Sequence, residues 1–271
     1  MCSTCGCSGE GSGTRVNLVE SQQHEHPQDH PHEHEHAEEH GHGHGHGHGH
    51  GHAPTVEQTR TILLEQEILS KNDSLAAANR HRLQEQGITA VNLMSSPGSG
   101  KTTLLENTVH ALAGKRETLV IEGDQETWLD AQRIRATGSK VVQINTGAGC
   151  HLDADMLGSG LTELAPPDGS LVFVENVGNL VCPALFDLGE TARVVIISVT
   201  EGADKPAKYP YMFRTADLVL LNKIDLLPYV DFDVDLCLGL INQLKPDARV
   251  LQISATRGDN LSGWLDWLAA L

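Results

Sequence analysis

Residues 95–103, which read SSPGSGKTT, have the types and spacing that most clearly indicate chemistry. The backbone N–H groups of such a glycine-rich loop point at one place and can bind phosphate oxygens there. We expect Lys101 to reach the β- and γ-phosphates of a nucleotide, and the Thr102 hydroxyl to ligate Mg²⁺. Ser95 replaces the usual first glycine, so we interpret the loop as a variant. The expected phosphate-binding residues are Gly98, Ser99, Gly100, Lys101, Thr102 and Thr103.

Two further segments carry acids directly after apolar runs. Residues 122–124 read EGD, and residues 175–178 read ENVG. Asp124 or Glu175 could orient the Mg²⁺ shell or the attacking water, and the N–H of Gly178 could sense a γ-phosphate. Either acid could instead be a helix N-cap or a loop carboxylate. Lys101, Asp124 and Glu175 are therefore the candidate catalytic residues.

A third motif that accompanies a phosphate-binding loop is the NKID segment, formed by residues 222–225. Asp225 can accept hydrogen bonds from N1–H and the 2-amino group of guanine, whereas adenine would leave its carboxylate unpaired. Ser254 and Ala255 follow a later apolar run, in a loop like the one whose N–H reads guanine O6. This order and spacing predict binding of GTP over ATP. The expected base-binding residues are Asn222, Lys223, Asp225, Ser254 and Ala255.

A second kind of chemistry is indicated by Cys150, His151 and Cys182. Thiolate and imidazole groups are metal ligands, and three of them leave a fourth position for water or a second subunit. Both segments lie beside the expected phosphate-sensing region, so nucleotide state could alter the metal geometry. The alternative is two buried thiols and a histidine that packs in the core. Cys237 lies among leucines and is expected to pack.

The first fifth of the chain carries further potential ligands. Cys2, Cys5 and Cys7 could close around one soft or borderline metal ion, as a trigonal site or with the terminal amine as fourth ligand. They could instead be reactive thiols without a role. Residues 24–52 hold thirteen of the sixteen histidines, which suits weak storage of several ions, although a purification tag is the alternative.

Composition divides the chain into a tail, a helical segment and one domain. Residues 1–53 contain almost no large apolar residues, and we expect them to be disordered. Residues 54–87 repeat apolar residues at three- and four-residue steps, which predicts one or two amphipathic helices packed on the core or a partner. Residues 88–271 are ample for one core.

Within residues 88–271, near-continuous apolar runs alternate with helical patterns. This alternation predicts a doubly wound α/β fold with a mostly parallel sheet of about seven strands, as in P-loop NTPases. Ligands bind at the carboxyl ends of strands in such sheets, where every motif above falls. The expected strands are 88–94, 118–122, 141–145, 171–175, 194–199, 218–222 and 250–254. The expected helices include 104–112, 128–136, 154–164, 233–244 and 261–271.

Charge and hydropathy exclude several classes of partner. The net charge is −17; residues 1–53 contribute eight acids and one base, or −7, which leaves −10 elsewhere. Such acidity argues against nonspecific binding of nucleic acid or membrane surfaces. No run is apolar for long enough to span a membrane, and no signal segment is evident. We expect a cytoplasmic protein whose cysteines are metal or redox ligands.

Together these motifs resemble the HypB family of hydrogenase nickel incorporation proteins, which is related to UreG of urease maturation. The resemblance covers nearly the whole chain. It rests on the CxxCGC start, the histidine-rich insert, SPGSGKTT at 96–103, EGD at 122–124, GCHLD at 149–153, ENVGNLVCP at 175–183 and NKID at 222–225. Ser95 and Glu175 look like features of that family.

The resemblance implies a slow, Mg²⁺-dependent GTPase that delivers nickel to the large subunit of [NiFe] hydrogenase, with a HypA-type nickel/zinc protein as partner. It implies a high-affinity nickel site at Cys2, Cys5 and Cys7. It also implies a nickel or zinc site at Cys150, His151 and Cys182, shared across a GTP-dependent homodimer. The rival hypotheses are a nickel storage protein, a maturation GTPase for urease or another metalloenzyme, and a P-loop kinase, for which residues 222–225 have no use.

Overall fold

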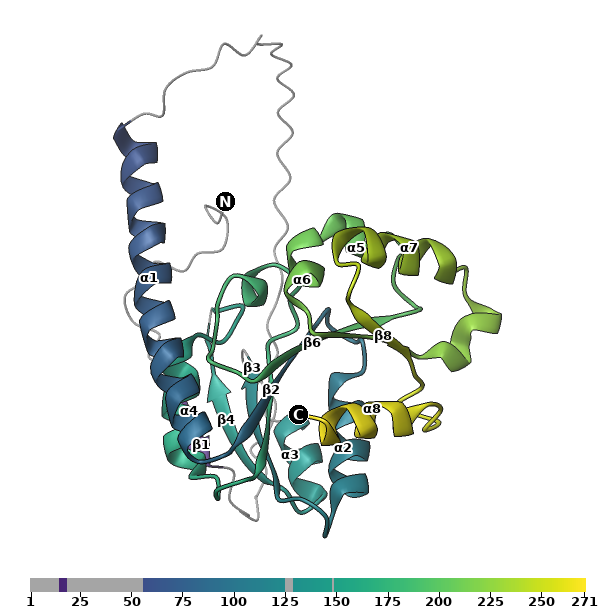
Figure 1. Cartoon of the computed structure of the whole chain (residues 1–271), viewed down its shortest axis with the longest axis horizontal. Coiled ribbons are helices and arrows are strands. Elements are labelled where there is room, and N and C mark those ends of the chain that lie inside the picture. Colours follow the sequence, from purple (N-terminus) through teal and green to yellow (C-terminus); the bar gives the residue numbers. More distant parts are fainter. Residues whose placement is uncertain (1–14, 19–55, 125–128, 148) are drawn as a thin grey trace, which may run out of the picture. The chain divides into compact units, whose positions relative to one another are not determined.

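The computed structural model describes residues 15–18, 56–124, 129–147 and 149–271 of the 271-residue chain (Figure 1). Of the described residues, 15–18 and those from 68 onward belong to one compact unit, and residues 56–67 belong to another. The sheet and the sites below belong to the first unit. No helix among the described residues combines the length and the apolar character that crossing a membrane requires.

The sheet has eight strands in the order β1-β4-β3-β5-β2-β6-β7-β8. The strands from β2 to β8 pair in parallel, as the apolar runs predict. Apart from the edge strand β8, their runs of valine, isoleucine and leucine are buried along almost their whole length, because helices cover both faces. The parallel strands are β2 (Thr89–Ser95), β3 (Thr118–Asp124), β4 (Lys140–Asn145), β5 (Leu171–Glu175), β6 (Ala192–Ser198), β7 (Leu218–Asn222) and β8 (Arg249–Gln252). The prediction of a doubly wound, mostly parallel sheet is confirmed.

Strand β1 (Arg15–Leu18) corrects the prediction that residues 1–53 are disordered throughout. It pairs antiparallel with β4, with Val16 opposite Ile144. Val16 and Leu18 pack against the apolar cluster beneath this edge of the sheet. Two alternating apolar residues in a polar tail are diluted when composition is averaged over fifty residues, yet they suffice for a short edge strand.

Nine further segments besides α1 (Val56–Glu85) are helical among the described residues. They are α2 (Lys101–Leu112), α3 (Leu129–Ala136), α4 (Ala154–Leu164), η1 (Cys182–Ala184), α5 (Lys205–Lys208), α6 (Pro210–Thr215), η2 (Ile224–Tyr229), α7 (Val234–Leu244) and α8 (Leu261–Ala269). One apolar cluster joins the sheet to α2, α3 and α8. Two others join its opposite face to α4 with the end of α1, and to α6 with α7 (Figure 1).

Helix α1 differs from the predicted amphipathic pattern in which residues it buries. Ile68, one of the predicted apolar positions, is 49% exposed. The buried stripe instead consists of Asn72, Ala76, Asn79 and Leu83, spaced at three or four residues. Two of these four residues are polar, so a hydrophobic pattern could not reveal this face.

Candidate nucleotide and metal site

The glycine-rich loop runs from the end of β2 into the first turn of α2. Gly100 has a φ of +100°, and a Cβ at this position would lie 2.6 Å from Nδ2 of Asn222, so the close approach requires glycine. The Lys101 ammonium donates a hydrogen bond to Oγ of Ser95 at 2.9 Å. The serine that replaces the usual glycine therefore holds the lysine that is expected to bind phosphate, and the serine hydroxyl itself donates to the Ser96 carbonyl.

A cleft of about 550 Å³ opens beside this loop. Its lining brings together the residues expected to bind phosphate and those expected to sense it, from four different strand ends. They include Gly98, Gly100, Lys101, Thr102, Thr103, Asp124, Glu175, Gly178 and Lys223. The structure therefore gathers most of the predicted nucleotide residues around one cavity at the carboxyl edge of the sheet.

Two buried acids lie opposite each other on adjacent strands, and one of them, Glu175, lines the cleft. Glu175 accepts a hydrogen bond from the Thr102 hydroxyl at 2.9 Å, and Glu122 is its partner in the register of β3 and β5. Burial raises the pKa of Glu175 to about 7, against the opposing effect of Lys101. Burial, and then the charge of Glu175, raise the pKa of Glu122 to about 9.

Each of these acids keeps one buried carboxyl oxygen that has no hydrogen-bond partner among the described residues. Buried polar atoms normally have partners, so two orphan oxygens beside a threonine hydroxyl point to a missing positive group. Oxygen ligands of this kind suit Mg²⁺. The residues present therefore fit the predicted cation at Thr102, and Glu122 joins Asp124 and Glu175 as an acid of this site.

The loop after β7 ties the phosphate loop to the last loop of the predicted site. Asn222 donates from Nδ2 to the Ser99 carbonyl at 2.8 Å and accepts from the Ala255 N–H at 3.0 Å. Lys223, in a left-handed conformation with φ 63°, donates to the Gly98 carbonyl at 2.6 Å. Asn222 thus holds the loops together from outside the cleft, whereas Lys223 lines it.

Asp225 lies at the start of η2, where its carboxylate is held by the neighbouring loop. Oδ1 accepts a hydrogen bond from the Ser254 hydroxyl at 2.6 Å, and the Arg257 guanidinium lies 3.9 Å from Oδ2. Asp225 and Ser254 are therefore in contact, as expected for two residues that read one base. A carboxylate fixed in this way can accept hydrogen bonds from a base without first losing conformational freedom.

The predicted metal ligands Cys150, His151 and Cys182 come together beside this edge of the sheet. Their ligand atoms all lie within 4.8 Å of one another. The sulfur atoms of Cys150 and Cys182 are 3.0 Å apart without forming a disulfide, while Nδ1 of His151 lies 3.8 Å from the Cys150 sulfur. Two thiols and one imidazole within this distance fit a soft or borderline metal ion. We call these three residues the metal triad.

His151 is held by packing as well as by the chain. Its ring stacks on Phe186 with 4.0 Å between centroids. Burial lowers the pKa of His151 despite the nearby charge of Asp153, so its imidazole is neutral at pH 7. A neutral imidazole has a nitrogen lone pair that can coordinate a metal ion, so metal binding by His151 requires no loss of a proton.

The metal triad is connected directly to the strand ends that line the cleft. Oδ1 of Asn176 accepts a hydrogen bond from the Leu152 N–H at 3.1 Å, and Asn179 donates to the Cys150 carbonyl at 3.4 Å. The Leu152 side chain also lies against Gly123, where a Cβ would come within 2.7 Å of it. Movement of residues 123 or 176 would therefore move the loop that carries Cys150 and His151.

Comparison with known proteins agrees with this arrangement. The family described as CobW/HypB/UreG, nucleotide-binding domain, matches residues 89–252. The hydrogenase maturation factor HypB of Azotobacter chroococcum is 56% identical over 216 residues, which are 80% of this chain and 71% of that protein. The chain belongs to the HypB family.

Solved HypB structures share the fold. HypB from Archaeoglobus fulgidus superposes with a TM-score of 0.70 and 40% identity, over 74% of this chain and 98% of that one. HypB from Helicobacter pylori, solved in complex with nickel, gives a TM-score of 0.69 and 38% identity, over 74% and 94% of the chains. The HypB resemblance expected from the motifs is confirmed, and the matched nucleotide-binding domain includes the phosphate loop, the metal triad and Asp225.

Sequence reasoning missed two residues that line the HypB cleft, Asp130 and Arg133. Arg133 donates to Glu106 at 2.6 Å and to the Thr103 hydroxyl at 3.3 Å, and it pairs with Asp130 at 3.3 Å. An acid and an arginine one helical turn apart, shortly after Asp124, were the available signal. Spacing of this kind is common on exposed helices, so it did not indicate a site.

Two predicted metal sites lie outside the described residues. They are Cys2, Cys5 and Cys7, and the histidine-rich segment 24–52. Their roles stay predictions. Cys237 is buried in α7 with the pKa of its thiol raised by burial to about 11, consistent with the packing role expected for it.

Proposed function

We propose that this chain is a GTP-hydrolysing nickel metallochaperone that delivers nickel to the large subunit of [NiFe] hydrogenase during maturation. The names of its relatives as hydrogenase maturation factors and the nickel complex of the Helicobacter pylori protein support the pathway and the metal. Nickel is the cargo in this proposal, and Zn²⁺ is an alternative occupant of the metal triad. The histidine-rich segment would store nickel.

The observation that carries the proposal is the hydrogen bond between Asn176 and the Leu152 N–H. Asn176 directly follows Glu175, which binds Thr102 in the cleft, and Leu152 directly follows the ligand His151. A change at the γ-phosphate position therefore reaches a metal ligand through one side chain. A nucleotide can alter metal affinity only if its two forms interact differently with the connected states.

Each residue of the nucleotide site would have a separate role in GTP hydrolysis. Lys101 leaves Ser95 to bind the β- and γ-phosphates, and Thr102 leaves Glu175 to ligate Mg²⁺. The bound Mg²⁺ would neutralise developing charge on the phosphates. Asp124 and Glu175 orient the metal shell or the attacking water, and Asp225 selects guanine. Loss of the γ-phosphate relaxes residues 175–178 and lowers the nickel affinity of the triad.

The partners follow from the same scheme. Three protein ligands leave a fourth position, which a second copy of the chain could supply, so we propose a homodimer that depends on GTP and metal. A HypA-type nickel/zinc protein and the hydrogenase large-subunit precursor would be the exchange partners. Gel filtration with a non-hydrolysable GTP analogue and nickel tests the dimer, and a monomer under these conditions would contradict it.

The central test measures nickel affinity with GDP and with a non-hydrolysable GTP analogue. It uses the full chain with Cys2, Cys5 and Cys7 replaced by serine, and follows thiolate-to-nickel absorption, to which histidines do not contribute. We call this chain the tail-serine protein. Coupling between sites is typically about 1–3 kcal/mol, which corresponds to roughly 5- to 150-fold. A tenfold difference that Cys150→Ala abolishes supports gating, whereas equal affinities would contradict it.

Nickel storage without delivery is the main rival. Deletion of residues 24–52 separates the two, and it spares β1. Storage alone predicts lost metal tolerance with normal hydrogenase activity after the deletion, and also normal activity for Lys101→Ala. Delivery predicts that Lys101→Ala abolishes hydrogenase activity while metal tolerance is kept.

A further inference from the structure

Helix α1 buries two asparagines, Asn72 and Asn79, in the stripe that faces the rest of the domain. They are 5% and 8% exposed. A carboxamide buried beside apolar side chains is costly unless its hydrogen bonds are satisfied, so its partners indicate what it is for. Both side chains face the same two segments of the chain.

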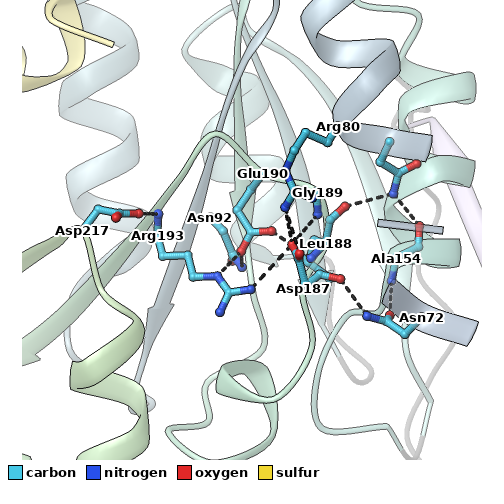
Figure 2. Close-up of polar contacts among 11 residues, drawn as sticks. Asn72, Arg80, Asn92, Ala154, Asp187, Leu188, Gly189, Glu190, Arg193 and Asp217 are labelled. Carbon is cyan, nitrogen blue, oxygen red and sulfur yellow. Dashed lines mark hydrogen bonds and ion pairs between the residues drawn. The ribbon is translucent and has the colours of Figure 1, made fainter. Parts of the chain in front are cut away.

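Each asparagine joins the segment after His151 to the segment after Cys182. Asn79 donates from Nδ2 to the carbonyls of Ala154, at 2.7 Å, and Leu188, at 3.0 Å. Asn72 accepts from the Ala154 N–H at 2.9 Å and donates to the Asp187 carbonyl at 2.8 Å (Figure 2). Ala154 begins α4, directly after the loop that carries two metal ligands. The two loops of the metal triad are thus clamped at their distal ends by one helix.

The same clamp leads back to the phosphate-sensing segment. Glu190, 6% exposed, accepts from the Leu188 N–H at 2.8 Å and from Nδ2 of Asn92 at 3.1 Å (Figure 2). Arg193 donates to Glu190 at 2.7 Å, and the positive guanidinium offsets the negative charge of the buried Glu190 carboxylate. Oδ1 of Asn92 accepts from Nδ2 of Asn176 at 3.3 Å.

These contacts close into a ring. From Leu152 it passes through Asn176, Asn92, Glu190, Leu188 and Asn79 to Ala154, which lies two residues after Leu152. The side chains of the ring are buried, and these six hydrogen bonds join them to one another or to backbone groups. A buried hydrogen-bond network of this kind favours one geometry, because a displacement leaves a polar group unpaired.

We propose that Asn79 and Asn72 are positioning residues of the metal triad, and that α1 sets the separation between the Cys150–His151 loop and the Cys182 loop. This inference rests on the proposed function, because it takes the triad as a nickel site. It adds that nickel affinity is controlled from a helix that contributes no ligand.

The test compares nickel affinities in the tail-serine protein, using thiolate-to-nickel absorption in competition with a chelator. Asn79→Leu keeps the size of the side chain and removes both of its hydrogen bonds. We expect nickel affinity to fall tenfold or more, with GDP affinity within twofold. Asn72→Asp keeps the acceptor for the Ala154 N–H but places a buried carboxylate oxygen against the Asp187 carbonyl, and we expect nickel affinity to fall here as well.

Arg82→Met is the matched control. Arg82 lies on α1 and donates to Thr162 and to the Leu161 carbonyl, so it joins α1 to the far end of α4 without touching either ligand loop. Its nickel affinity should stay within twofold of the tail-serine protein. A fall as large as that of Asn79→Leu would overturn the proposal, because loosened helix packing would then explain both.

The remaining outcomes are also decisive. Unchanged nickel affinity in folded Asn79→Leu and Asn72→Asp overturns the positioning role while leaving the nickel site in place. Absorption that Cys150→Ala does not remove overturns the nickel site and this inference with it. If Asn79→Leu fails to fold, Asn72→Asp decides, since it keeps the acceptor for α4 and replaces the hydrogen bond to the Asp187 carbonyl with a repulsion between two oxygen atoms.

Discussion

The phosphate cleft and the metal triad share one edge of the sheet, yet they are built in opposite ways. The cleft is formed around six consecutive residues, 98–103, whose backbone is held by glycine geometry and by Asn222. The triad takes side chains from two loops and is clamped by a helix that supplies no ligand. A site built from backbone is fixed locally, whereas a site built from side chains can be adjusted from a distance.

Lys101→Ala should abolish the activity of the cleft and leave nickel binding by the triad unchanged. This is the largest effect that we expect. Removing a group that stabilises charge in a transition state costs about 100- to 1000-fold in rate. GTP hydrolysis, measured as phosphate release, should fall by at least about 100-fold. Nickel binding to the tail-serine protein without nucleotide should change less than twofold. Lys115→Ala, at an exposed turn, is the control for loss of charge, and a decrease below tenfold for Lys101→Ala would contradict the assignment.

Asp225→Asn should separate two roles within the nucleotide site, because it changes the selection of the base and leaves the binding of phosphate unchanged. Hydrogen bonds to a charged group contribute about 1.5–3 kcal/mol, so the preference for GTP over ATP should fall roughly 10- to 100-fold. Competition binding of the two nucleotides measures the ratio. Asp231→Asn, on an exposed carboxylate nearby, should leave it unchanged. Selectivity that survives in Asp225→Asn would place base recognition elsewhere.

Gly123→Ala tests the junction between the two regions. The new Cβ would lie 2.7–2.9 Å from three atoms of the Leu152 side chain. Overpacking of this kind costs about 1–3 kcal/mol, so the melting temperature should fall by several degrees. Nickel affinity should fall as well, because Leu152 adjoins His151. Gly239→Ala, where the Cβ would meet nothing within 4 Å, is the control for the glycine-to-alanine change itself.

A double-mutant cycle decides whether Leu152 transmits the effect of Gly123→Ala. Combining it with Leu152→Ala removes the atoms that clash, so the double variant should lose less stability than the sum of the two single changes. Strict additivity would mean that the strain spreads through the strand instead. The cleft and the triad would then be connected by the hydrogen bonds of Asn176 and Asn179, and not by the contact of Leu152 with Gly123.

The difference between the regions also explains what the sequence could predict. The strands were predictable because buried parallel strands carry continuous apolar runs. The location of the motifs was predictable because ligands bind at the carboxyl ends of such strands. The residues of the cleft followed from short contiguous patterns. Cys150, His151 and Cys182 were predictable as residue types, and their convergence followed from their place after neighbouring strands.

Residues that position a site through contacts with distant segments of the chain were not predicted. Asn72 and Asn79 look like exposed helix residues, because a pattern of burial is read from apolar side chains. Glu122 looks like an ionised acid until the structure shows it buried opposite Glu175. Arg133 reaches the cleft from a helix with unremarkable spacing. Each depends on a contact with a distant segment, which no local pattern records.

Glu122 distinguishes the acids beside the cleft from the triad, because it should make the stability of the folded protein depend on pH. With a pKa of about 9 in the folded protein and an ordinary value near 4.5, the carboxyl is protonated when folded and ionised when unfolded between these values. The folded state binds more protons there, so the wild-type protein loses stability as pH rises from about 5 to 9.

Glu122→Gln mimics the neutral acid at every pH, so it should escape this loss. Without nucleotide or metal, the melting temperature of the variant relative to the wild type should rise by roughly 10 °C between pH 5 and pH 8, because a proton bound only in the folded state changes stability by about 4 kcal/mol over three pH units. Any constant cost of the amide cancels, because the comparison is between two pH values. Glu117→Gln, at the exposed residue before the same strand, should give a difference that does not vary with pH. A flat difference for Glu122→Gln would mean that its carboxylate is ionised and paired in the empty cleft, and the argument from its orphan oxygen to a cation site would then fail.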